Sequence, residues 1–104
     1  MFVLLVVSSD TLGTIRDIIG LSNSLSEKGN KVVIFFNEES VNILKKGREE
    51  LTVLPVGTRL KVCRTTASKK GLNNRDDLII GTEMSSLGEL VDLMEEADRT
   101  VFLG

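Results

Sequence analysis

Residues 2–7 read FVLLVV, an unbroken apolar run of strand length. A strand with one face in water alternates apolar and polar side chains, so a run without alternation predicts a strand that is covered on both faces. Residues 31–36 (KVVIFF) repeat the pattern and are rich in β-branched and aromatic residues. The first run is therefore predicted to be a central strand of a sheet, and the second a further strand of the same kind.

The segments around these two runs carry helix signals. Apolar side chains recur at three- and four-residue spacing after residue 11, which predicts a helix from about residue 11 to residue 28 that ends at Gly29. Ser8-Ser9-Asp10 supply side chains that favour the N-cap of that helix. Asn37 is expected to cap a second, shorter helix that ends at Lys45-Lys46-Gly47. Residues 48–58, around Pro55 and Gly57, predict a loop with a partial helical turn.

The second half of the chain continues the alternation of strands and helices. A capping box, Ser86-Leu87-Gly88-Glu89, marks the start of the last helix, and a stripe of apolar residues follows it. In chain order, the predictions are a strand at residues 60–63, a helix ending near Lys70, a short strand at 77–80 (DLII), a loop at 81–85, the helix after Ser86 and a last strand at 100–103.

Strands that alternate with helices predict a parallel sheet with helices on both faces, joined by right-handed crossovers. With five strands, we expect an α/β fold, a flavodoxin-like three-layer sandwich with strand order 2-1-3-4-5, formed by residues 1–104 as one domain. Ligands of such sheets gather at the carboxyl ends of strands one and three. Those ends carry Ser8, Ser9 and Asp10 on one strand and Cys63 on the other, so we expect the three residues to form a rim beside Cys63.

Composition narrows the function classes. The formal charge is −2, with basic residues dispersed between acidic ones, so nucleic acid is not an expected partner. The longest apolar run is far too short to span a bilayer, and no basic region precedes it, so we expect a cytoplasmic protein whose thiol stays reduced. The chain has one Cys and no His, Trp or Tyr. We therefore expect neither a metal site nor a cofactor.

Cys63 is the candidate functional residue, because it stands where a strand gives way to a short helix. Unpaired backbone N–H groups and the helix dipole at such a position favour a thiolate. Arg64 and Lys69 would add Coulomb attraction, and Thr65 and Thr66 can donate hydrogen bonds to an anion. Free cysteine is also a common buried small apolar residue, so a purely structural role stays open.

Several chemistries of this fold class can be checked against the sequence. A phosphorelay receiver needs an acid at the end of strand three, where Cys63 stands instead. A cysteine phosphatase needs Arg six residues after its Cys, where this chain has Lys69. A phosphate or flavin site at the hydroxyl-rich turn of residues 8–14 stays open, although Ser and Asp are also ordinary helix caps.

The chain resembles the DsrE/DsrF-like family, which includes the TusD-type sulfur carriers. The resemblance covers essentially the whole sequence. It lies in the apolar first strand and its polar turn, in KVVIFFNEESV, LKVCRTTASKKGL and DLIIGTEMSSLGELVDLMEEAD, and in the closing TVFLG.

The resemblance implies sulfur relay. In such carriers the cysteine that matches Cys63 accepts sulfane sulfur from a donor protein, holds it as a persulfide and passes it to an acceptor protein, which is sulfurtransferase-type chemistry without a cofactor. Family members commonly form homo- or hetero-oligomers. Some lack the cysteine and serve as structural subunits, so the alternative is a non-catalytic assembly or regulatory subunit in which Cys63 is only packed.

Overall fold

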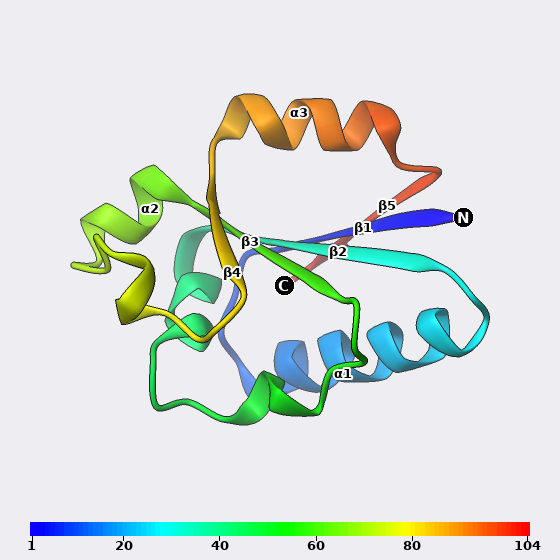
Figure 1. The fold of residues 1–104 in the computed structure, drawn as a ribbon, viewed down its shortest axis with the longest axis horizontal. Helices are drawn as coiled ribbons and strands as arrows, with labels where there is room; N and C mark the ends of the chain where they lie inside the picture. The colour runs from blue at the N-terminus through cyan, green and yellow to red at the C-terminus, as the bar shows by residue number, and fades with distance from the viewer.

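The computed structural model describes all of residues 1–104 as a five-stranded, fully parallel sheet between helices (Figure 1). This arrangement confirms the predicted fold class. The strands are β1 (Phe2–Val7), β2 (Lys31–Phe36), β3 (Arg59–Cys63), β4 (Thr82–Ser85) and β5 (Arg99–Leu103). The helices are α1 (Leu12–Glu27), α2 (Arg64–Lys69) and α3 (Leu87–Glu96), with three short 3-10 helices, η1 (Glu38–Leu44), η2 (Glu50–Val53) and η3 (Arg75–Asp77).

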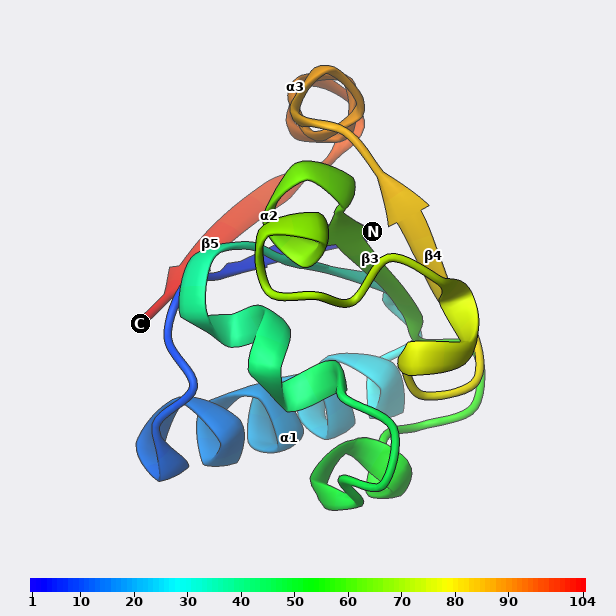
Figure 2. The ribbon, with the colours of Figure 1, turned by 90° about the vertical axis from the view of Figure 1, so that its left-hand side faces the viewer.

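The strand order is β4-β3-β2-β1-β5. The predicted order is 2-1-3-4-5. Both orders pair β1 with β2 and β3 with β4. In the structure, however, β3 pairs with β2 rather than with β1, and β5 pairs with β1 rather than with β4. The sequence pattern does not distinguish the two orders, because both allow right-handed crossovers and the same alternation of strands and helices. Here β1 to β4 step across the sheet in one direction, and α3 then returns over the other face to place β5 beyond β1 (Figures 1 and 2).

The two faces of the sheet carry apolar layers of unequal size. Seventeen buried residues form the larger cluster, on the side of α1 and η1, whereas only five form the smaller one, on the side of α3. All but the first residue of β1 and of β2 is buried, which confirms that both strands are covered on both faces. The smaller cluster consists of Leu4, Val6, Val33, Phe35 and Cys63.

Helix α1 begins after Thr11, whose side chain accepts a hydrogen bond from the Thr14 N–H. The predicted N-cap at Ser8-Ser9-Asp10 is therefore wrong by one residue, because those three residues still belong to the turn that leaves β1. The helix ends as predicted at Gly29, which has a φ of +82°. The N–H groups of Gly29 and Asn30 bond back to the carbonyls of Ser26 and Leu25, which closes the last turn.

The strand predicted at residues 77–80 is wrong, and the fourth strand lies at 82–85, where a loop was predicted. Leu78 is buried and forms an antiparallel bridge with Lys45, while the Ile79 N–H bonds to the Leu44 carbonyl, so this stretch pairs with η1 rather than with the sheet. Gly81, with a φ of +90°, then turns the chain toward β3.

The segment after β2 is also helical in a different way from the prediction. Residues 38–44 form a 3-10 helix, η1, and residues 50–53 form the partial turn expected in the following loop.

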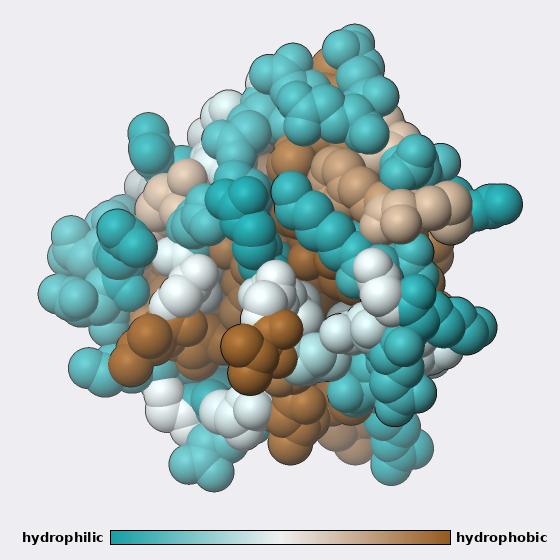
Figure 3. Space-filling view, turned by 45° about the vertical axis from the view of Figure 1, so that its right-hand side comes forward, coloured by the Kyte–Doolittle hydropathy of each residue, from teal (hydrophilic) through white to brown (hydrophobic).

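Apolar side chains also reach the surface, and Figure 3 shows them as separate groups among hydrophilic residues on one face. The most exposed are Val56 and Ile80. None of the helices has the length and apolar composition needed to cross a membrane.

Candidate functional site

Cys63 ends β3 and occupies the N-cap position of α2, as the sequence predicts. Its side chain, however, makes no hydrogen bond to the first turn of α2. The residue is only 2% exposed and packs in the smaller apolar cluster, against which Leu90 and Leu93 of α3 also lie. The thiol therefore sits under α3 and not at the open mouth of α2.

The predicted anion-binding side chains of α2 lie mostly at the surface. Arg64, Thr65 and Lys69 are exposed and form no side-chain hydrogen bond or ion pair. Thr66 instead donates from its hydroxyl to Oδ1 of Asn37, at 2.8 Å. The structure thus places Arg64 and Lys69 near Cys63 along the chain, but it does not bring either side chain to the sulfur.

Asn37 was not expected at this site. It follows β2, and its Oδ1 accepts both the Glu38 N–H, at 2.9 Å, and the Thr66 hydroxyl. Beside it, Lys70 at the end of α2 pairs with Glu39, at 3.2 Å. These two contacts fix α2 to η1 and so hold the segment that follows Cys63. The sequence signal was the Asn after a buried strand, which we interpreted only as a helix cap.

The predicted rim residues Ser8, Ser9 and Asp10 do not join Cys63. They follow β1, and β2 lies between β1 and β3, so the two strand ends are separated by about 10 Å, or two strand spacings. This correction follows directly from the observed strand order. Ser9 instead shares a hydrogen bond with Thr14, and Asp10 accepts one from Asn42.

The hydroxyl-rich turn of residues 8–14 is equally unlike an open phosphate cradle. Thr11 donates to the Thr14 hydroxyl at 3.0 Å and also caps the Thr14 N–H. Because Ser9, Thr11 and Thr14 bond to one another, these hydroxyls serve the start of α1. The structure supports the helix-cap interpretation of this turn.

An ion cluster around one buried lysine lies on the same face of the sheet as Cys63. Lys61, two residues earlier on β3, is 6% exposed, and its Nζ pairs with Glu83 at 3.3 Å and with Glu89. Arg59 also pairs with Glu83, at 3.0 Å. Glu83 comes from β4 and Glu89 from the first turn of α3, so the cluster fixes the start of α3 above β3. We missed it, although Lys61 is the only charged residue inside an apolar strand.

The two carboxylates of this cluster have shifted pKa values. A hydrogen bond from Lys61 is the main cause that lowers the pKa of Glu89 below its ordinary value of 4.5, with burial opposing it and Ser85 assisting. A hydrogen bond from Arg59 is the main cause that lowers the pKa of Glu83. Both groups therefore favour the charged form in the folded protein.

This shift predicts an acid-dependent loss of stability through Glu89. A folded pKa below the unfolded one stabilises the protein at neutral pH, and the contribution is lost as the pH falls from about 4.5 through the folded value. Because the Glu89 side chain is 40% exposed, we expect about 1 kcal/mol or less. Denaturant unfolding at several pH values should show a shallower acid slope for Glu89→Gln. Glu95→Gln, on the exposed side of α3, should keep the native slope, and an unchanged slope for Glu89→Gln would contradict the assignment.

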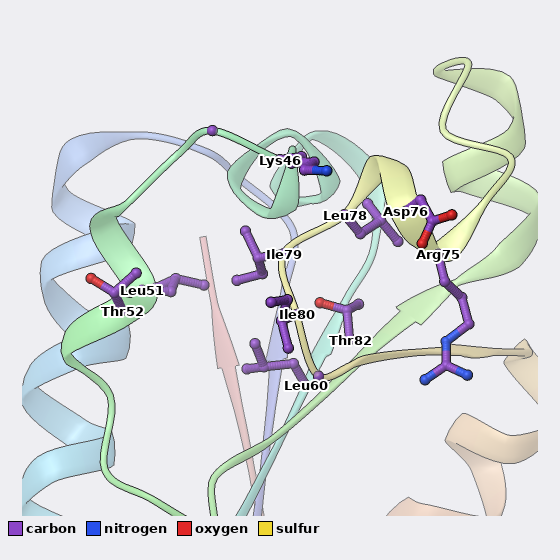
Figure 4. A pocket seen from close by; sticks show the side chains of 12 residues that line it. Lys46, Leu51, Thr52, Leu60, Arg75, Asp76, Leu78, Ile79, Ile80 and Thr82 are labelled. Carbon is purple, nitrogen blue, oxygen red and sulfur yellow. The ribbon is translucent and has the colours of Figure 1, made fainter.

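A groove of about 770 Å³ lies elsewhere on the molecule, between the turn that follows η1, the helices η2 and η3, and the segment before β4 (Figure 4). Leu51, Leu60 and Leu78 form part of its apolar lining, and Lys46 stands at its edge. Leu60 belongs to the larger apolar cluster, so the groove lies on the opposite face of the sheet from Cys63. No group of three or more His, Cys, Asp or Glu side chains is arranged to hold a metal ion.

Comparisons with known proteins give a family model and a sequence relative. A model of the DsrE/DsrF-like family matches residues 1–103. The uncharacterized protein MK0008 of Methanopyrus kandleri is 28% identical over 85 residues, which are 72% of this chain and 69% of that protein.

Two solved structures have the same fold. Protein MTH1491 of Methanobacterium thermoautotrophicum, described as of unknown function, superposes with a TM-score of 0.86 at 20% identity, over 97% of each chain. The ychN protein from E. coli superposes with a TM-score of 0.77, also at 20% identity and over 97% of each chain.

Proposed function

The chain belongs to the DsrE/DsrF-like family, and from this premise we propose that it is a sulfur carrier in which Cys63 accepts sulfane sulfur as a persulfide and passes it to a partner protein. The family match over residues 1–103, together with a single cysteine at the carboxyl end of β3, carries the proposal. Family membership supports a sulfur-relay role in general, and the assignment to Cys63 is ours.

The proposed step balances without an oxidant or a metal. The Cys63 thiolate attacks the outer sulfur of a donor hydropersulfide, which forms a new S–S bond on Cys63. The S–S bond of the donor breaks, and the donor cysteine leaves as a thiolate with the bonding electron pair. An acceptor thiolate then attacks the outer sulfur on Cys63 in the same way, which returns Cys63 to its thiolate.

The sulfur anion on Cys63 must be stabilised, and a donor protein must be able to reach it. We propose that backbone N–H groups of residues 64–66, with Arg64 or Lys69, stabilise it when a partner is bound. Because Cys63 is 2% exposed, a donor reaches it only when α3 shifts. Helix α3 has no fully buried residue and covers the smaller apolar cluster, so it is the element best suited to such a shift.

One observation favours a second candidate function. The thiol is packed among apolar side chains and makes no hydrogen bond to α2, as expected for a structural cysteine in an assembly subunit. The two functions differ in the folded protein: a carrier alkylates and accepts sulfur at Cys63 under native conditions, whereas a structural cysteine reacts only after unfolding.

Intact-protein mass spectrometry tests the proposed function. The native chain is incubated with a small-molecule persulfide donor and compared before and after treatment with a reductant. We expect a gain of one sulfur atom that the reductant reverses. No gain, together with alkylation that occurs only in denaturant, would establish the assembly-subunit function instead.

We also propose that the outer side of α3 contacts partner chains. Leu87, Val91 and Met94 are 55%, 54% and 39% exposed and recur at helical spacing, so they form one apolar stripe. This stripe supports the homo- or hetero-oligomer expected from the family resemblance.

Size-exclusion chromatography with light scattering tests this stripe. We expect the native chain to associate and Val91→Asp to shift the population toward the monomer by about tenfold or more, because a charge would be buried in the contact. Val53→Asp alters another valine, 60% exposed, and should leave association unchanged. A monomeric native chain would contradict self-association through α3.

A further inference from the structure

Three buried hydroxyl groups have no hydrogen-bond partner at an ordinary distance and angle: those of Ser22, Thr82 and Ser85. Burying a hydroxyl without a partner costs free energy, so each one calls for an explanation. Thr82 pairs in register with Leu60, whose side chain belongs to the larger apolar cluster. Ser85 differs, because it lies on the face of the sheet that carries Cys63.

The strand register places Ser85 beside Cys63. The two residues are directly paired on the adjacent parallel strands β4 and β3. Paired residues on neighbouring parallel strands point to the same face and lie about 5 Å apart. Since the Cys63 side chain enters the cluster under α3, the Ser85 side chain faces the same space. Ser85 is 4% exposed, so bulk solvent does not reach its hydroxyl.

The charged side chains on this face are already engaged with one another. Lys61 is held by Glu83 and Glu89, and Arg59 is held by Glu83, so none of the cations is free to turn toward the sulfur. The Ser85 hydroxyl lies close enough to the Glu89 carboxylate to lower its pKa through a hydrogen bond, so it stands at the border between the ion cluster and the apolar cluster that contains Cys63. Its distance and angle to Glu89 fall outside those of an ordinary hydrogen bond. A serine hydroxyl has one proton, which can be directed to another acceptor on the same face by rotation about the C–O bond.

We infer that Ser85 donates its hydroxyl proton in a hydrogen bond to the sulfur anion on Cys63, first to the thiolate and then to the persulfide. This inference rests on the proposed function of Cys63. Hydrogen bonds from a neutral donor to an ionised acceptor are stronger than those between neutral groups. Ser85 thus stabilises the sulfur anion inside the smaller apolar cluster, where the exposed cations of α2 do not reach it.

The test variant is Ser85→Ala, which removes the hydroxyl. Two controls accompany it: Ser85→Thr keeps the hydroxyl, and Thr82→Val removes a buried hydroxyl on the other face of β4. The rate of alkylation of Cys63 by iodoacetamide is measured across the pH range, with sulfur uptake measured separately by mass spectrometry. We expect Ser85→Ala to react about tenfold more slowly near neutral pH, and Ser85→Thr and Thr82→Val to react at the native rate.

The dependence of the alkylation rate on pH distinguishes the loss of a hydrogen bond to the sulfur from a change in how easily iodoacetamide reaches Cys63. At high pH, where the thiol is ionised in every variant, Ser85→Ala should react as fast as the native chain. Slower reaction at all pH values, or the native rate at neutral pH, would overturn the inference. Alkylation requires only the thiol, so its rate tests the role of Ser85 independently of sulfur transfer. If the native chain takes up no sulfur, that result refutes the proposed function and leaves the test of Ser85 intact.

Discussion

Replacing Cys63 with serine should abolish sulfur uptake completely. Serine has nearly the same shape, but its hydroxyl does not ionise near neutral pH and does not attack a persulfide. Cys63 is the only cysteine of the chain, so no second thiol can take over the reaction. The measurement is the mass of the intact Cys63→Ser protein after incubation with a persulfide donor, beside the native chain.

The matched control is Cys63→Ala, which removes the thiol without adding a hydroxyl to the apolar cluster. Both variants should unfold cooperatively and both should fail to gain sulfur. A sulfur gain in either variant that matches the native gain would show that the sulfur binds elsewhere on the chain. That result would remove Cys63 from the mechanism.

Phe35 and Phe36 give the largest expected loss of stability. Both are fully buried on β2, and they point to opposite faces of the sheet. Replacing either one with alanine leaves a large cavity in a packed layer, so the free energy of unfolding should fall by about 3–5 kcal/mol. Because small domains are stable by only about 5–15 kcal/mol, denaturant unfolding should detect either change easily.

The Phe35 and Phe36 substitutions also distinguish two ways in which the thiol could become exposed, namely local opening at α3 and global unfolding. Phe35 shares the smaller cluster with Cys63, whereas Phe36 belongs to the larger cluster. If α3 opens locally, then Phe35→Ala should raise the alkylation rate of Cys63 by about tenfold more than Phe36→Ala does, after correction for stability. Equal rates in the two variants would mean that the thiol is reached only through global unfolding.

The strands that are buried on both faces were predictable from sequence, and so was the order of elements along the chain. FVLLVV and KVVIFF mark β1 and β2 within a residue, and the Ser86 cap marks the start of α3. The order of strands across the sheet was not predictable in this way, since periodicity reports burial but not the identity of a neighbour. DLII was mistaken for a strand because a short apolar run that packs on η1 has the same composition as one in a sheet.

The position of Cys63 on the chain was predictable, but the direction of its side chain was not. A strand-to-helix junction favours a thiol at the helix N-terminus, yet alternation along β3 decides which face each side chain takes. Lys61 and Cys63 are two residues apart and therefore share a face, and Lys61 finds its carboxylates under α3. The partners Glu83 and Glu89 are distant in sequence, so neither the ion cluster nor Ser85 was visible before the strands were placed side by side.

The strand order also has a consequence for folding. Strands β1 to β4 are complete in the sequence by residue 85, but β5, which pairs with β1, follows only at residues 99–103. Until β5 is in place, the edge of β1 has unpaired backbone groups in an apolar strand, which is a template for pairing with another chain. A folding intermediate that lacks β5 is therefore open to pairing with another chain along β1, and this exposure ends when α3 has carried β5 across the sheet.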